Sequence, residues 1–273
     1  MDFRMEFRIL GPLEVRDRRG HLVPIGQPVH REVLAVLLFY AGERCSQDRL
    51  IEALWPDGRP KRPVANLAVH ICRIRAQLGQ AAGLKTLPGA YQIDPDPGAL
   101  DLREFQLLTA RAQQAIARDD RQLACELLRA ALQCWREPPL NDLPSAPCLA
   151  GDVAQLLQQR RTAESTHIDL MLALRRHQEV VADLHGMVMT ADYRLDEHVW
   201  WQLILALHRC GRRADALYAY QRARDVLKDD LGLEPSDDLQ RLLNVVLHDG
   251  EDRAVPAALG GPAGRERVLA AGR

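Results

Sequence analysis

The sequence lacks any stretch that is apolar for long enough to span a membrane. Its longest apolar run extends from Val33 to Ala41, whereas a membrane-spanning helix needs about 20 apolar residues. The N-terminal residues MDFRMEF carry charges where a secretion signal requires an apolar core. These absences predict a soluble, cytoplasmic protein with no membrane partner.

Motifs for catalysis and for metal binding are missing as well. The sequence has no GxxxxGKS/T phosphate loop, no GxGxxG after an expected strand and no GxSxG. Its six cysteines form no CxxC pair, and its nine histidines show no HExxH motif and no metal-ligand spacing. We therefore expect that the protein is not an enzyme and that it holds no cofactor and no metal.

The formal net charge of −1 conceals a difference between the two halves of the 273 residues. Residues 1–96 contain 14 Lys and Arg against 11 Asp and Glu, and the remainder contains 22 against 26. A strong nucleic-acid binder is usually far more basic than this first half. The count predicts modest DNA affinity for a single copy, with a second copy or a partner adding to it.

The segment from Val64 to Gly79, VANLAVHICRIRAQLG, is the most informative part of the chain. An apolar stripe recurs at helical spacing, formed by Leu67, Ile71, Ile74 and Leu78. The remaining positions present side chains suited to DNA and no acidic residue, namely Asn66, Val69, His70, Arg73, Arg75 and Gln77. Such a helix of about 22 Å has a suitable length for a major groove.

The neighbouring segments place this helix in a larger motif. Upstream, residues 29–43 and 45–57 read as two helices, the second with Ser46 as N-cap. Downstream, LKTLPGAYQID predicts a hairpin that turns at Pro88 and Gly89, which corresponds to a wing. Near the N-terminus we expect two alternating strands and, after Gly20, a third extended run.

The second half of the chain is expected to be almost entirely helical. The segment from Asp94 to Gly98 contains two prolines and a glycine and marks the boundary between the two halves. After it, Asp101 with Glu104 offers a capping-box pattern at a helix start. Segments beginning at Leu174 and Cys210 resemble each other at an offset of 36 residues, a period typical of tetratricopeptide (TPR) helix pairs. Gly211 suits the turn of the second pair, whereas Arg175 stands at the glycine position of the first. A last helix is expected from near Pro235.

Several of these motifs resemble the streptomycete antibiotic regulatory protein (SARP) family. The matching segments are FRILGPLEV, DRLIEALWPD, CRIRAQLG, LDLREFQLL and LALHRCGRRADALYAYQRARDVLKDDLGLEPSDDLQRL. They follow the family's order from about Met5 to His248. At Ala68 and Val69 the chain departs from the family pattern, which has polar residues there.

The resemblance implies a mostly α protein with two domains. Residues 1–97 would form an OmpR-type winged helix-turn-helix with a small β-sheet and a wing hairpin. Residues 98–249 would form the bacterial transcriptional activation domain, an all-α TPR-like helical array. We expect residues 250–273 to be a disordered tail, since they are rich in Gly, Ala and Arg without a sustained period.

The resemblance also implies a function. The protein would be a transcriptional activator of a secondary-metabolite (antibiotic) gene cluster. It would bind direct repeats in double-stranded promoter DNA near the −35 element, beside a second copy of itself, and recruit RNA polymerase holoenzyme. Trp200 and Trp201 offer a surface for contact between copies, although paired tryptophans in a helical array are more often core residues.

The expected DNA contacts divide into base-reading and phosphate contacts. By resemblance to OmpR-type recognition helices, Arg73 and Val69 face base edges. Arg75, Ser46 and Lys85 are expected at the phosphate backbone, with a solvated surface arginine as the alternative for Arg75. The remaining residues expected at the DNA interface are Arg31, Asn66, His70 and Thr86.

The loop between the second and third helices, WPDGRPKRP, is long for a turn and contains three prolines that stiffen it. We expect it to face RNA polymerase, and a phosphate clamp is the alternative. The residues expected to make this contact are Trp55, Asp57, Arg59, Lys61 and Arg62.

Two other functions remain open at the level of sequence. A repressor of the same architecture would place its binding site over the promoter core. A TPR-type adaptor would use the N-terminal module to bind protein instead of DNA, and the low basicity of that module leaves this alternative open.

Overall fold

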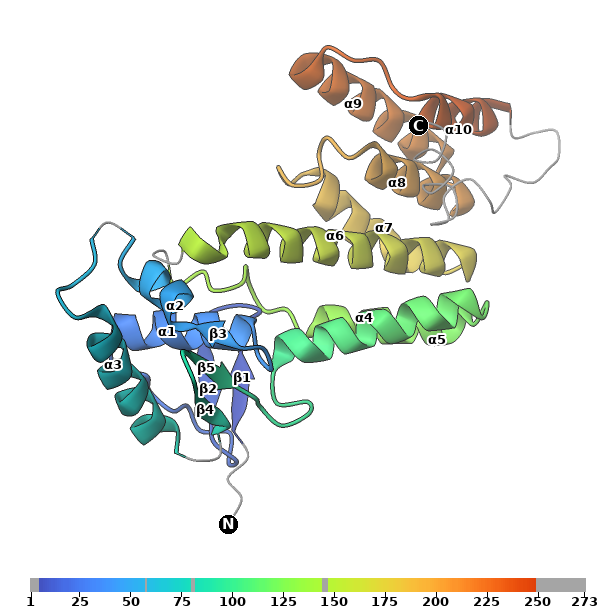
Figure 1. Cartoon of the computed structure of the whole chain (residues 1–273). Coiled ribbons are helices and arrows are strands. Elements are labelled where there is room, and N and C mark those ends of the chain that lie inside the picture. Colours follow the sequence, from blue (N-terminus) through green and yellow to red (C-terminus); the bar gives the residue numbers. More distant parts are fainter. Residues whose placement is uncertain (1–4, 57, 80–81, 144–146, 249–273) are drawn as a thin grey trace. The chain divides into compact units, whose positions relative to one another are not determined.

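The computed structural model describes residues 5–56, 58–79, 82–143 and 147–248 (Figure 1). These residues form two compact units. The first contains residues up to 114 together with 127–161, and the second contains 115–126 together with residues from 162 onward. The boundary expected at residue 97 rests on a change in the sequence pattern, whereas these two units are groups of residues that pack together. The expected tail, residues 250–273, lies outside the described residues.

The first unit begins with strands and helices in the order that the sequence predicts. Its elements are β1 (Glu6–Arg8), β2 (Glu14–Arg16), α1 (Pro28–Phe39), β3 (Cys45–Ser46), α2 (Gln47–Leu54), α3 (Pro63–Leu78), β4 (Leu84–Leu87) and β5 (Ala90–Ile93). β1 and β2 form an antiparallel pair, and the second sheet has the strand order β3, β5, β4. The winged helix-turn-helix is therefore present, with β4 and β5 as the wing hairpin.

Helix α1 forms the core of this domain, with α2, α3 and β5 packed against it (Figure 1). Pro28 occupies the first turn of the helix, where its missing N–H has no intrahelical partner to lose. All side chains from Val33 to Leu38 are buried. A helix that is apolar on every side must be covered on every side, and this requirement fixes α2 and α3 against it.

One expected strand does not form. The extended run after Gly20 makes only an isolated bridge, between Leu22 and Arg16. Leu22 is 61% exposed, so its side chain does not hold the run against the core, and Pro24 has no N–H to contribute to a ladder. The third strand of the wing sheet is instead β3, in which Cys45 pairs with Tyr91.

The helical part begins with three long helices that contribute to both units, followed by four more. They are α4 (Asp101–Ala117), α5 (Arg121–Gln133), α6 (Ala150–Ala173), α7 (His177–Val188), α8 (Glu197–Arg209), α9 (Arg213–Leu231) and α10 (Asp237–His248). A short 3₁₀ turn, Pro147–Leu149, precedes α6.

Three helix pairs, α4–α5, α6–α7 and α8–α9, share one turn geometry. Asp119, Arg175 and Gly211 have φ angles of 57°, 60° and 75°. In each turn this residue donates its N–H to the carbonyl three positions earlier, and the following N–H donates to the carbonyl five positions earlier. This is the Schellman ending of a helix. The TPR-like pairs expected from the sequence are present, and α4–α5 is an additional pair that the sequence analysis did not identify.

Helix α8 is the core helix of the second unit. Trp200 and Trp201 are 3% and 9% exposed, so both are core residues and offer no surface to another copy. Gln202 is fully buried and donates to the carboxylate of Asp169 at 2.7 Å and to the backbone carbonyl of Ser165 at 3.0 Å. These bonds join α8 to α6, and α10 packs on α8 and α9.

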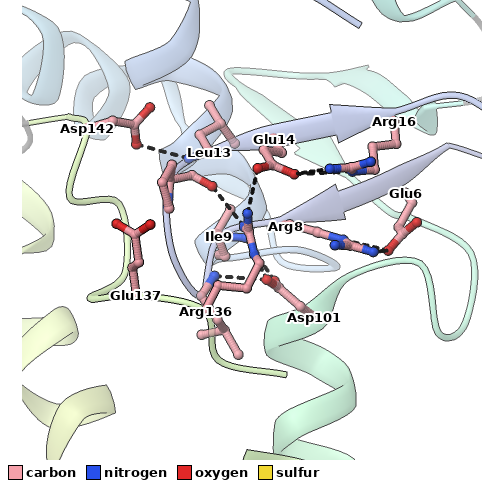
Figure 2. Close-up of polar contacts among 12 residues, drawn as sticks. Glu6, Arg8, Ile9, Leu13, Glu14, Arg16, Asp101, Arg136, Glu137 and Asp142 are labelled. Atoms are coloured by element: carbon pink, nitrogen blue, oxygen red, sulfur yellow. Dashed lines mark hydrogen bonds and ion pairs between the residues drawn. The ribbon is translucent and has the colours of Figure 1, made fainter. Parts of the chain in front are cut away.

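Within the first unit, a group of polar contacts joins the β1–β2 hairpin to the segment that follows residue 97 (Figure 2). Asp101 accepts hydrogen bonds of 2.9 Å from the backbone N–H groups of Ile9 and Leu10. Arg136 donates to the carbonyl of Pro12 at 2.9 Å and pairs with Glu14 at 2.7 Å. These contacts, which we call the hairpin seam, fix the N-terminal hairpin on residues that lie about 90 to 125 positions later in the chain.

The capping box expected at Asp101 and Glu104 does not form. The Glu104 N–H donates to the backbone carbonyl of Leu100, and the Asp101 carboxylate instead serves Ile9, Leu10 and its neighbour Leu102. Burial raises the pKa of Asp101 to about 6, although the three N–H donors act in the opposite direction. Asp101 is therefore mainly ionised at neutral pH and accepts these bonds as a carboxylate.

Candidate nucleic-acid interface

The inner face of α3 is the apolar stripe expected from the sequence. Leu67, Ile71, Ile74 and Leu78 are all at most 4% exposed. They pack the helix on α1 and α2. The opposite face is solvent-exposed along the whole helix, with Asn66, Val69, Arg73 and Gln77 among its residues. The helix thus presents to solvent the side that the sequence assigns to DNA.

The sequence around α3 is free of negative charge over a long distance. No acidic residue occurs between Asp57 and Asp94, whereas this interval contains six lysines and arginines. Arg59, Lys61 and Arg62 are exposed before α3, and Lys85 is exposed on β4 after it. A continuous basic interval of this kind attracts phosphate. The charge summed over residues 1–96 conceals this basic interval, because the acidic residues of that half lie outside it.

Arg75 connects α3 to the wing. Its guanidinium donates to the backbone carbonyl of Leu84 at 3.3 Å and to the hydroxyl of Thr86 at 2.9 Å. Thr86 thus accepts the bond that fixes β4 against the helix. Two residues expected at the DNA interface, Arg75 and Thr86, are therefore hydrogen-bonded to each other.

His70 points inward. Its ring lies against that of buried His30 on α1, with ring centroids 5.3 Å apart, and 6.2 Å from the ring of Trp55. Burial lowers the pKa of His70, and the charge of Arg73 lowers it further. His70 and Trp55 are both half-buried, and their rings contact the packing behind α3. The contacts that the sequence predicts for them, with DNA and with the polymerase, stay predictions.

The remaining expected contacts are distributed over the edges of the domain. Ser46 caps α2, and its hydroxyl accepts from the backbone N–H of Arg49 at 3.2 Å, as predicted. Arg31 donates to Asp142 and to the carbonyl of Leu13, so it belongs to the hairpin seam and not to the exposed face of α3. Of the loop residues, Asp57 lies outside the described residues.

Arginines near α2 are a feature that the sequence analysis did not identify. Arg49 is exposed in the first turn of α2, and its guanidinium lies 3.7 Å from the centre of the Tyr40 ring. Arg44 donates to the carbonyl of Pro88 at the tip of the wing. Arg49 follows the N-cap Ser46 by three residues, so the sequence could have placed it in the first turn of α2, near the cap.

Two other kinds of site are absent from the described residues. No group of three or more His, Cys, Asp or Glu side chains there could hold a metal ion. Likewise, none of the helices in the described ranges has the length and hydropathy required to cross a membrane.

Residues 100–247 match the family model of the bacterial transcriptional activator domain. The chain is 31% identical to the regulatory protein DnrI of Streptomyces peucetius over 269 residues, which cover 93% of this chain and 98% of DnrI. It is 34% identical over 254 residues to the regulatory protein AfsR of Streptomyces griseus, of which the match covers only 26%.

The fold is similar to that of a solved structure. Mycobacterium tuberculosis EmbR, solved in complex with a low affinity phosphopeptide, superposes with a TM-score of 0.84 at 29% sequence identity. The superposition covers 99% of this chain and 70% of the EmbR chain. The chain therefore corresponds to almost all of DnrI, to most of the EmbR chain and to about a quarter of AfsR.

Proposed function

Because this chain belongs to the streptomycete antibiotic regulatory protein family, we propose that it activates a secondary-metabolite gene cluster by binding promoter DNA. Its relatives are regulators of transcription, and the chain is a transcription regulator as well. The finer proposal is that α3 enters the major groove at direct repeats near the −35 element and that RNA polymerase is recruited there.

The observation that carries the proposal is the construction of α3. Its inner stripe is buried, its outer face is exposed, and Arg75 holds the wing beside it. The surrounding interval has positive charge and no negative charge. A helix anchored on one side and open on the other, within a basic surface, is the arrangement that reads base edges while phosphates are neutralised.

Footprinting on the DNA that flanks the protein's own gene cluster tests this proposal. We expect protection of two direct repeats beside the −35 element. Protection over the promoter core would indicate a repressor. Binding should weaken with salt, because each phosphate contact adds about 0.9 to the slope of log K against log salt concentration. A flat salt response would contradict DNA binding and favour the protein adaptor.

Two variants separate the proposed roles of individual residues. Arg73→Ala should cost about 1 to 3 kcal/mol on the specific site and relax the preference at one base position. Lys85→Ala should weaken binding to all sequences about equally, because a phosphate contact carries no sequence information. The reverse pattern would mean that α3 lies in the groove with a different rotation.

A further inference from the structure

Helix α3 carries a second apolar stripe on its exposed side. Ala65, Ala68, Val69, Cys72 and Ala76 are all solvent-exposed. Their spacing of i, i+3, i+4, i+7 and i+11 places them in one line along the helix. A surface helix normally has one apolar stripe, which faces the core, and here the core stripe is already supplied by Leu67 and its partners. The outer line, which we call the outer stripe, therefore requires another explanation.

The side chains of the outer stripe are small. Val69 is the largest of them and is 49% exposed, and the others are alanines and a cysteine. Three alanines and a cysteine offer little apolar area to a protein partner, whereas they allow the helix backbone to approach a surface closely. The stripe is thus suited to a narrow partner whose apolar groups are small and lie inside a groove.

The charge around α3 indicates which kind of partner the outer stripe contacts. Arg73 is exposed next to Cys72, and Lys85 is exposed on β4, which follows the helix in the sequence. The whole interval from residue 58 to residue 93 has no acidic residue. A partner that is polyanionic at its edges and carries small apolar groups in a groove is double-stranded DNA with thymine, whose 5-methyl group lies in the major groove.

We propose that the outer stripe reads the 5-methyl groups of thymine. The DNA site then contains thymines opposite Ala68, Val69 and Cys72, beside a guanine that Arg73 reads through its N7 and O6 atoms. This inference rests on the proposed function and adds to it which bases the DNA site contains. Specificity at the thymines comes from methyl contact and not from hydrogen bonds.

The first test removes the methyl groups from the DNA. A duplex selected by the full chain from a random pool is resynthesised with deoxyuridine in place of single thymines, which keeps every pairing edge and deletes one methyl. Affinity is measured by fluorescence anisotropy. We expect about a fourfold loss for each contacted thymine, the factor that corresponds to burial of one methyl group. Deoxyuridine placed outside the protected region serves as the control and should change nothing.

The second test combines removal of a thymine methyl group from the DNA with removal of side-chain methyl groups from the protein. For Val69→Ala the loss caused by deoxyuridine should shrink from about fourfold to less than twofold at one thymine and stay unchanged at the others. Val69 is exposed, so the variant should fold. Leu107→Ala, at an exposed apolar residue of α4, is the matched control and should retain the full sensitivity.

The third test uses the cysteines of the chain itself. Cys72 and Cys210 are both exposed, and only Cys72 lies on the outer stripe. Alkylation by N-ethylmaleimide, followed by mass spectrometry of the peptides, should be slowed at least tenfold at Cys72 when the selected duplex is bound. Alkylation at Cys210 should proceed at an unchanged rate.

The outcomes separate this inference from the function on which it rests. Salt-dependent, sequence-specific binding without any sensitivity to deoxyuridine would overturn the methyl proposal and leave DNA binding intact. Equal alkylation of Cys72 with and without the duplex would also overturn it, because the outer stripe would then be outside the groove. Failure to select any duplex would overturn both proposals.

Discussion

His30 is a buried histidine without a hydrogen-bond partner for either ring nitrogen among the described residues. It is 2% exposed and lies against His70 behind α3. Burial lowers the pKa of His30 from the ordinary value of 6.5, and the neighbouring His70 and Arg73 lower it further. Folding therefore disfavours the protonated form of both imidazoles, and protonation must work against the packing of α3 on α1.

This geometry predicts a dependence of stability on pH. A histidine whose pKa is lowered by folding contributes stability that is present above about pH 6.5 and is lost as the pH falls. The free energy of unfolding of the wild type should thus decrease between pH 7 and pH 5. His30→Leu removes the titrating group and its unpartnered nitrogens, and should be more stable than the wild type at pH 5.5 by about 1 kcal/mol. Urea unfolding followed by circular dichroism measures both, and parallel pH profiles for the two proteins would contradict the prediction.

Arg75 is the second residue whose role depends on its contacts. Its bonds to Leu84 and Thr86 make it a residue that positions the wing, whereas the sequence suggests a phosphate contact. Arg75→Ala should weaken DNA binding while leaving the slope of log K against log salt unchanged. A phosphate contact would instead lower that slope by about 0.9. Lys85→Ala, measured in the same titrations, provides the reference for a lost phosphate contact.

Among the elements, the hairpin seam carries the largest predicted effect on stability. Asp101→Ala leaves the N–H groups of Ile9 and Leu10 without their acceptor, at a cost of about 1 to 3 kcal/mol for each buried donor. The expected loss in the free energy of unfolding is therefore about 2 to 6 kcal/mol. Glu6→Ala is the matched control, because the pair of Glu6 with Arg8 is only half-buried and contributes at most about 1 kcal/mol. Equal effects of the two changes would show that the seam adds little.

The loop between α2 and α3 is the element proposed to face RNA polymerase. Lys61 and Arg62 are exposed immediately before α3. Charge reversal at both positions should abolish transcription in a reconstituted assay while DNA affinity stays within about threefold. If affinity falls together with transcription, the loop acts as a phosphate clamp, and the polymerase contact must be sought elsewhere.

At the scale of the whole molecule, we propose that two copies bind head to tail on direct repeats. The N-terminal half has only 14 Lys and Arg against 11 Asp and Glu, so one copy presents few phosphate contacts, and a second copy on the same face of the duplex about doubles them. Trp200 and Trp201 are core residues, and contact between copies must use other surfaces.

The spacing of the repeats tests this assembly. Inserting about five base pairs between the repeats turns one copy to the opposite face of the duplex and should eliminate cooperative binding, whereas inserting about ten should restore much of it. Gel-shift titrations with the three duplexes measure the cooperativity. Equal cooperativity for all three would mean that the copies bind independently.

The sequence by itself determined the features that depend on neighbours along the chain. The two faces of α3, the cap at Ser46 and the wing turn at Pro88 and Gly89 follow from helical spacing, side-chain capping and turn chemistry. The structure has each of them. Arg175 has the left-handed conformation of Gly211, its counterpart in the repeat, although the sequence analysis predicted no such conformation at an arginine.

Only the tertiary structure decided which polar side chains are free to meet DNA. Arg75 is engaged with the wing, His70 with His30, and Arg31 with Asp142, a partner 111 positions away in the sequence. Residue type specifies that an arginine can donate several hydrogen bonds, but it does not specify the acceptor. That choice depends on distances between segments remote in sequence, which local periodicity does not encode and which packing of the hydrophobic core sets.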